Sequence, residues 1–296
     1  MELSVAQILG LVLKVCILAT VFALGLKAAW ADVASLLHRP GLLMRSLFAM
    51  YVLTPLVALL LVFAFSAPLA VELAVLLMAI SAGAPLLPKK LFKLGANPPY
   101  VYSLSVIAAL LAIVTVPISL TILSMFFARS ASVPAGEVAY TIATVFLAPL
   151  LAGMVVRQLW PVQAERISDP IISTANIILL GLVLLILATN LSAILVVGPS
   201  GFAMIVVMTF AALAIGHALG GPDPNDRTAL AIACASRFPA LVMLIASLNF
   251  PNAKPLPVVA AYLVFSNLAA IPYMRWRAAE RKAQVAAQSN ANAAQQ

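Results

Sequence analysis

The sequence predicts an all-α integral membrane protein whose two halves repeat in inverted order and whose two matching central helices are broken by proline. Three observations lead to this fold class. The 296-residue chain is 64% hydrophobic and only 9% charged, with a mean hydropathy of +1.13. Its apolar residues fall into long stretches separated by short polar connectors. A seven-residue pattern, A-x-A-x-x-x-P, also occurs twice, once in each half.

The apolar stretches are each long enough to cross a membrane, or nearly so, because about 20 residues of helix span a bilayer. There are nine, at about 3–26, 41–65, 69–87, 99–127, 138–156, 171–195, 202–219, 229–248 and 256–273. We therefore expect a single transmembrane domain of nine helices over residues 1–282. The segment 283–296 is rich in Ala, Gln and Asn, and we expect it to be a disordered cytoplasmic tail.

The distribution of basic residues orients the predicted bundle. With nine spans, 13 of the 17 Lys and Arg residues fall on one side of the membrane. The positive-inside rule places that side in the cytoplasm, so the N-terminus lies outside and the C-terminus inside. The sequence thus predicts a multi-pass protein of the cell (inner) membrane. The net charge of +8 is explained by this asymmetry, and we expect no nucleic-acid partner.

The repeated pattern interrupts spans 3 and 8. The first copy covers residues 82–88 and contains Pro85 and Pro88; the second covers residues 233–239 and ends at Pro239. Proline removes a backbone donor, and the freed carbonyl groups must be satisfied by protein or by cavity water. Matched breaks in the two halves of a membrane protein indicate a binding site near the middle of the membrane, as in secondary transporters.

Arg237 is the main candidate for the binding residue at this site. It lies within span 8, and no carboxylate of the sequence lies at mid-membrane depth to pair with it. One interpretation is that Arg237 anchors a small organic anion, because its guanidinium group binds carboxylate, sulfate or phosphate through two hydrogen bonds. The alternative is a structural role in which Arg237 caps carbonyl groups freed by Pro239.

Other candidate substrate-binding residues are weaker. Lys89 and Lys90 follow the first break and serve equally well as cytoplasmic anchors. Lys14 lies in span 1, and we expect it to face a water-filled cavity. Ser236 and Asn267 either form hydrogen bonds within the core or reach a ligand.

Several classes of function are disfavoured. The predicted spans contain no paired carboxylates, no Ser/His set and no metal-binding cluster, so we expect neither an enzyme nor a cofactor or metal site. The two cysteines, Cys16 and Cys234, lie far apart within apolar spans, which argues against a disulfide framework. A channel would need a continuous stripe of polar residues along several helices, and the predicted spans contain only isolated polar residues. A secondary carrier for an organic anion remains, with a non-transporting membrane sensor as an alternative.

The chain resembles the bile acid:sodium symporter family over nearly its whole length, and four segments carry the resemblance. They are the connector Leu-Leu-His-Arg-Pro at 36–40, Lys-Leu-Gly-Ala-Asn at 93–97, Asp226-Arg227-Thr228, and Tyr-Leu-Val-Phe-Ser-Asn at 262–267. The resemblance implies inverted repeats in a nine-helix, divergent member, in which the broken spans 3 and 8 cross. It also implies a panel, which we assign to spans 1, 2, 5 and 6, and a core of spans 3, 4, 7, 8 and 9.

The chain departs from this family where sodium binds. Sodium-coupled members carry Glu, Gln and Asn in the second broken helix, and the matching positions here are Ile232, Ser236 and Arg237. In the first repeat, Lys90 or Lys89 matches an Asn. The side chains of Ile, Arg and Lys contain no oxygen atom and cannot serve as the oxygen ligands of a sodium ion. We therefore expect transport without conventional sodium coupling; the alternative is a sodium-coupled symporter of bile acids or other organic anions.

Overall fold

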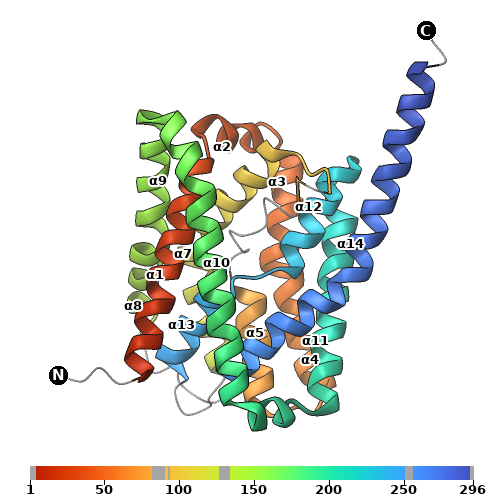
Figure 1. The fold of residues 1–296 in the computed structure, drawn as a ribbon. Coiled ribbons are helices and arrows are strands. Elements are labelled where there is room, and N and C mark those ends of the chain that lie inside the picture. The colour runs from red at the N-terminus through yellow and green to blue at the C-terminus, as the bar shows by residue number, and fades with distance from the viewer. Residues whose placement is uncertain (1–4, 82–90, 93, 127–133, 251–255, 294–296) are drawn as a thin grey trace.

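The computed structural model describes residues 5–81, 91–92, 94–126, 134–250 and 256–293, and every regular element longer than one residue in these ranges is a helix (Figure 1). The helices up to the middle of the chain are α1 (Val5–Lys27), α2 (Trp30–Leu37), α3 (Pro40–Phe48), η1 (Ala49–Leu53), α4 (Thr54–Ala64), α5 (Leu69–Ile80), α7 (Pro98–Phe126), α8 (Ala135–Ile142), η2 (Ala143–Leu147) and α9 (Ala148–Leu159). The later helices are α10 (Pro161–Thr189), α11 (Leu191–Leu219), α12 (Pro224–Ala235), α13 (Pro239–Asn249) and α14 (Leu256–Ala293).

Within the described residues, seven helical segments are long and apolar enough to cross a membrane. They correspond to predicted spans 1, 2, 4, 5, 6, 7 and 9. Predicted span 3 coincides with the shorter apolar helix α5, and predicted span 8 with the pair α12 and α13. The structure thus confirms an all-α integral membrane protein, whereas the count of nine crossings remains a prediction.

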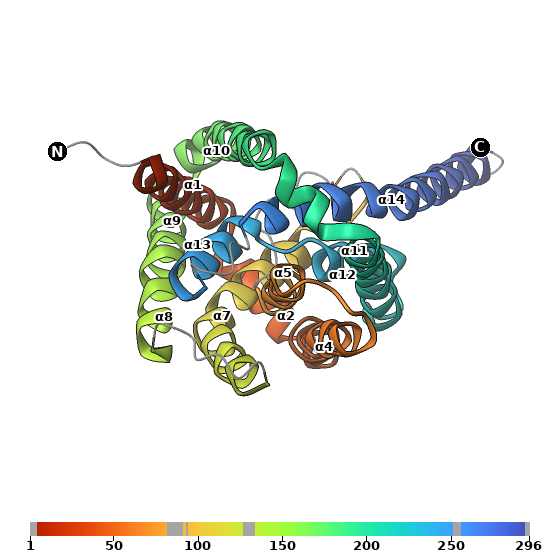
Figure 2. The same ribbon diagram turned by 90° about the horizontal axis from the view of Figure 1, so that it is seen from below.

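The helices α1, α9 and α10 pack against one another on one side of the bundle (Figure 2). Two glycines allow α1 and α9 to touch through their backbones: a Cβ atom on Gly25 would lie 2.2 Å from the Leu150 carbonyl oxygen, and one on Gly153 would lie 2.2 Å from that of Phe22. Such contacts between small residues are a common means of joining membrane helices. This group contains the predicted panel spans 1, 5 and 6.

Span 2 packs elsewhere than we expected. Its helical part α4 makes its main contacts with α5 and α11, and η1 contacts α11 and α12. Span 2 therefore joins the helices of the predicted core instead of the group formed by α1, α9 and α10. The apolar sequence of α4 gave no sign of this choice, because all faces of the helix carry similar residues.

The second tightly packed pair is α11 and α12. A Cβ atom on Gly216 would lie 2.4 Å from the Ala231 Cα atom, and one on Gly220 would lie 2.4 Å from the Arg227 Cα atom. Gly216 lies in the last turn of α11 and Gly220 caps its C-terminus, so α12 lies directly on the backbone at this end of α11. Figure 2 shows α5, α12 and α13 in the middle of the bundle, enclosed by the longer helices.

The last helix is longer than the sequence led us to expect. The disordered tail predicted from residue 283 instead continues the helix α14 as far as Ala293. Ala, Gln, Glu and Lys all favour helix, and no glycine or proline follows Pro272. In Figure 1, α14 projects beyond the bundle at the end opposite to the one where α1 begins.

Candidate functional site

The break in span 8 is three residues long. The helix α12 ends at Ala235 and α13 begins at Pro239, and the backbone between them is extended at Ser236 (φ −96°, ψ 105°) and Phe238 (φ −93°, ψ 91°). Proline favours an extended conformation in the residue before it, which accounts for Phe238. Because the helical hydrogen-bond pattern stops here, carbonyl groups in the last turn of α12 are left without their usual donors.

The guanidinium group of Arg237 lies in this break and donates to three main-chain carbonyl oxygens. Its Nε donates to Cys234 at 3.0 Å, its Nη1 to Ser81 at 2.9 Å, and its Nη2 to Met50 at 3.0 Å. The side chain is buried, with 3% of its surface exposed. One arginine thus joins the end of α12, the end of α5 and the middle of span 2.

Each acceptor is a carbonyl group that a local break has released. Ser81 follows the last residue of α5, where the backbone becomes extended (ψ 154°). Met50 lies in the π-helical turn η1, in which the Thr54 N–H donates to Ala49 instead of Met50. The donor that a π-helix would offer to Met50 is residue 55, which is proline and has no N–H. The Met50 carbonyl group is therefore free to accept from Arg237.

Among the described residues, no carboxylate compensates the positive charge of Arg237. The ionisable groups that act electrostatically on Arg237 are Cys234, Tyr51 and Tyr262, all of which are neutral near pH 7 in ordinary surroundings. No carboxylate among the described residues lies within 4.0 Å of the guanidinium group. The three carbonyl dipoles solvate the charge without neutralising it, so the break in span 8 remains electropositive.

The other predicted site residues are placed as follows. Ser236 lies in the break, half-buried, and its N–H donates to Ile232. Asn267 is exposed on α14 and donates to the Leu263 carbonyl oxygen at 2.7 Å. Lys14 is exposed on α1, on the same face as Leu11 and Leu18. Lys89, Lys90, Pro85 and Pro88 lie outside the described residues.

The structure therefore brings Ser236 and Arg237 together at the break, as their adjacency in the sequence requires. It does not show Lys14 facing an internal cavity, because the face of α1 on which it lies points away from the buried residues Leu13, Cys16 and Ile17. No group of three or more potential metal ligands occurs in the described part of the chain.

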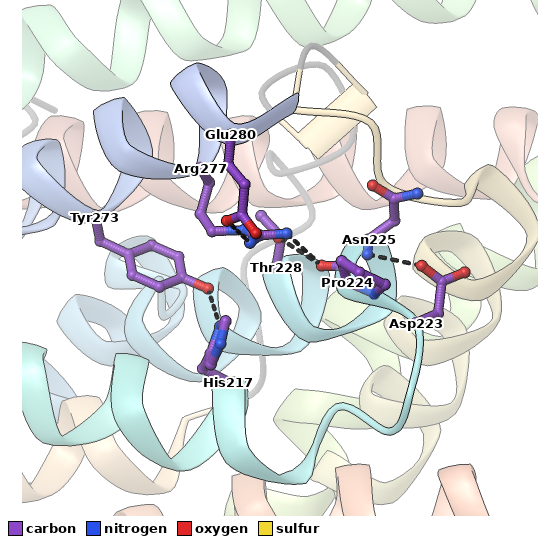
Figure 3. A network of polar contacts seen from close by, with 8 residues as sticks. All are labelled: His217, Asp223, Pro224, Asn225, Thr228, Tyr273, Arg277 and Glu280. Atoms are coloured by element: carbon purple, nitrogen blue, oxygen red, sulfur yellow. Dashed lines mark hydrogen bonds and ion pairs between the residues drawn. The ribbon is translucent and has the colours of Figure 1, made fainter. Parts of the chain in front are cut away.

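A second polar cluster lies at the other end of α12 (Figure 3). The Arg277 side chain of α14 donates to the Thr228 hydroxyl at 2.7 Å and to the Pro224 carbonyl oxygen at 2.8 Å, and pairs with Glu280. Nearby, the imidazole of His217 and the hydroxyl of Tyr273 form a hydrogen bond of 2.9 Å. This cluster fastens the first turn of α12 to α14.

Asp226, in the same turn of α12, is a residue that the sequence reasoning passed over as part of a polar connector. It is buried, its Oδ2 lies 3.9 Å from Nη1 of Arg39, and its Oδ1 has no hydrogen-bond partner among the described residues. Beside Arg39 is a cavity of about 230 Å³, lined by Leu36, Arg39, Asn97, Pro99 and Tyr100. The signal available in the sequence is the acidic residue at the start of span 8, in the segment Asp226-Arg227-Thr228.

Comparison with known proteins agrees with this architecture. The model of the Sodium Bile acid symporter family matches residues 14–197, which is more than half of the chain and includes span 2 and the first of the two breaks. No curated protein matches the chain. Taken with the membrane-spanning helices and the break in span 8, the match shows that the chain belongs to the sodium bile acid symporter family of membrane transporters.

Proposed function

We propose that the chain is a secondary carrier for a small organic anion, working by alternating access without sodium coupling. The observation that carries the proposal is the contact of the Arg237 guanidinium group with three released carbonyl oxygens. In transporters with broken helices, such carbonyl oxygens coordinate sodium ions or protons. Here a cation that is part of the protein occupies them, which leaves no reason for a mobile one.

The same charge favours an anionic substrate. Arg237 has five N–H groups, and three of them donate to these carbonyl oxygens, so the site keeps donors for a ligand. The helix α13 begins at Pro239, two residues after Arg237, and the dipole of this half-helix adds positive electrostatic potential at the break. A ligand bearing a carboxylate, sulfate or phosphate group suits such a site.

Arg237 and Ser236 form the centre of the proposed substrate site, because both lie in the break of span 8. Lys89 and Lys90 follow the first break in the sequence and are proposed as further contacts. Asn267 and Lys14 remain candidates on the sequence argument alone. The packing suggests how access alternates: α1, α9 and α10 form one group, and α5, α11, α12 and α14 form the other.

The proposal is tested with purified protein in a potassium buffer. A library of small carboxylates, sulfates and phosphates is screened for an increase in melting temperature, since a ligand that binds the folded state stabilises it. Each ligand found is then used in counterflow assays with proteoliposomes, and its uncharged amide or ester serves as the control.

We expect saturable counterflow of at least one anion, with no stabilisation by the uncharged analogue. Binding without counterflow would instead support a membrane sensor and contradict the carrier proposal. Equal stabilisation by the uncharged analogue would contradict the role of charge at Arg237.

A further inference from the structure

Asp226 is a buried carboxyl group with an incomplete set of partners. The residue is 3% exposed, and its Oδ1 accepts no hydrogen bond from the described residues. An ionised carboxylate in such surroundings loses its hydration without recovering equivalent contacts, which favours the neutral form.

The surrounding charges do little to hold Asp226 ionised. Arg39, in the corner between α2 and α3, is the only cation of the described chain in salt-bridge range; it is 3.9 Å away and its side chain is 62% exposed. Asp223, at the N-terminal cap of α12, repels the ionised form. Burial is the main reason that the pKa of Asp226 is raised to about 6, with Asp223 adding to the rise and Arg39 opposing it.

The other charged groups around this turn have partners elsewhere. Arg277 on α14 binds Thr228, Pro224 and Glu280, the Nε of Arg227 donates to the Gly221 carbonyl oxygen at 2.6 Å, and Arg281 donates to the Phe92 carbonyl oxygen at 3.2 Å. From α7, Tyr100 interacts electrostatically with Asp226, and its hydroxyl forms a hydrogen bond of 2.8 Å with Ser46.

Asp226 lies at a position where its charge can change how the first turns of α12 pack against their neighbours. The remaining faces of the first turns of α12 are held firmly, by the glycine contacts with α11 and by Arg277 of α14. Toward the corner of α2 and α3, Asp226 meets Arg39 in a long contact, with 3.9 Å between its Oδ2 and the Nη1 of Arg39. The cavity of about 230 Å³ beside Arg39 leaves room for this side of the interface to rearrange.

We propose that Asp226 is a proton-binding site that controls the packing of α12 against the corner between α2 and α3. The neutral carboxyl group fits the buried position, and the packed arrangement persists. When the proton leaves, the carboxylate draws water or Arg39 toward itself, and the interface loosens at this end of the bundle.

The direction of the pH effect follows from the raised pKa. A carboxyl group whose pKa is higher in the packed state than in water stabilises packing at low pH. That stabilisation is lost as the pH rises through about 6. If the open state has an ordinary Asp pKa, the opening equilibrium increases roughly tenfold between pH 5 and pH 7.5.

Hydrogen–deuterium exchange of the purified full-length protein tests this inference, with rates corrected for the intrinsic effect of pH. In the wild type, we expect residues 36–43 and 224–232 to be about tenfold less protected at pH 7.5 than at pH 5. Asp226→Asn should keep the high protection at both pH values. Glu165→Gln is the matched control, because Glu165 is an exposed carboxylate paired with Arg157 at 2.9 Å; its pH dependence should equal that of the wild type.

Two further variants keep the test decisive if Asp226→Asn folds poorly. Arg39→Gln removes the attraction that favours ionisation, so the transition should move to higher pH. Asp223→Asn removes the repulsion while Asn still caps α12, so the transition should move to lower pH. Equal protection of residues 36–43 at both pH values in the wild type would overturn the inference, as would shifts of the two variants in the same direction.

Discussion

At the scale of single residues, the side chain of Arg237 determines both the architecture and the chemistry of the candidate site. It is buried without a carboxylate among the described residues, yet its charge is solvated by carbonyl groups from three separate segments. A guanidinium group suits this task because its planar fork presents donors in several directions at once. A lysine ammonium group carries the same charge on a single atom.

Substitutions of Arg237 should therefore separate charge from geometry. Arg237→Gln should lower the melting temperature, because two or three carbonyl groups lose a donor at a cost of roughly 1–3 kcal/mol each. It should also lose most of its affinity for an anionic ligand. Arg237→Lys should be destabilised to a similar degree but keep part of the affinity, because the positive charge remains.

Thermal unfolding and ligand titration on the same samples measure both effects. If Arg237→Gln melts early and binds the anion as the wild type does, Arg237 is only a structural cap, and the proposed site loses its centre.

The sequence indicated that Arg237 was exceptional but left two roles open, anchor and cap. The structure shows contacts of the kind expected for a cap, and they include partners that no local pattern could have identified. Met50 lies 187 positions away along the chain, and its carbonyl group is released only because a π-helical turn precedes Pro55. Asp226 was missed because acidic residues at the ends of spans are usually solvated, and burial depends on packing that the sequence does not show.

At the scale of helices, the two π-helical turns are the informative elements. In span 2, η1 is followed by Pro55, and in span 5, η2 is followed by Pro149, each at the second residue of the next helix. In the structure, the extra residue in each turn accommodates the missing donor, and only the first turn supplies a carbonyl group to Arg237.

The pair of prolines provides a matched test of this arrangement. Pro55→Ala restores an N–H that competes for the Met50 carbonyl oxygen, so we expect a loss of about 1–2 kcal/mol, even though proline is the poorer helix former. Pro149→Ala changes the same kind of turn, η2, whose carbonyl groups are not among the acceptors of Arg237, and its stability should be unchanged or higher. Equal effects on the two melting temperatures would contradict the proposed release of Met50.

The glycine contact between α1 and α9 supports a second test at this scale. Gly153→Ala places a methyl group 2.2 Å from the Phe22 carbonyl oxygen, so the two helices must separate. We expect a loss of roughly 1–3 kcal/mol in thermal unfolding. Gly181→Ala is the control: apart from the nearby backbone of α10 itself, no atom lies within 4 Å of the added carbon, and alanine should stabilise α10 by up to about 1 kcal/mol. Similar melting temperatures for the two variants would refute the close contact.

At the scale of the whole molecule, the proline pattern predicted the break in span 8, whereas the matching break at 82–88 lies outside the described residues. Composition and span length were enough to predict an all-α membrane bundle. They did not predict the grouping of the helices. Span 2 was expected beside spans 1, 5 and 6, but α4 packs on α5 and α11. A helix that is apolar on every side can pack in several ways, so its neighbours are decided by the fit of the whole bundle.

The orientation of the molecule is a further prediction at this scale. Because 13 of 17 basic residues fall on one side of a nine-span bundle, we expect an external N-terminus and a cytoplasmic C-terminus. Single cysteines introduced at positions 3 and 290 can be labelled in intact cells with a membrane-impermeant thiol reagent. Only the first should react before the cells are permeabilised; reaction of both from outside would rule out nine spans.

We propose that a fixed guanidinium group replaces the coupling cation at the break in span 8. The most direct measurement is a titration of the wild-type protein with sodium chloride, matched by potassium chloride, in which melting temperature and anion affinity are followed together. A protein with its own cation at the carbonyl oxygens should respond equally to both salts, so the two curves should coincide. A saturable stabilisation, or a saturable gain in anion affinity, with sodium but not with potassium would contradict the account.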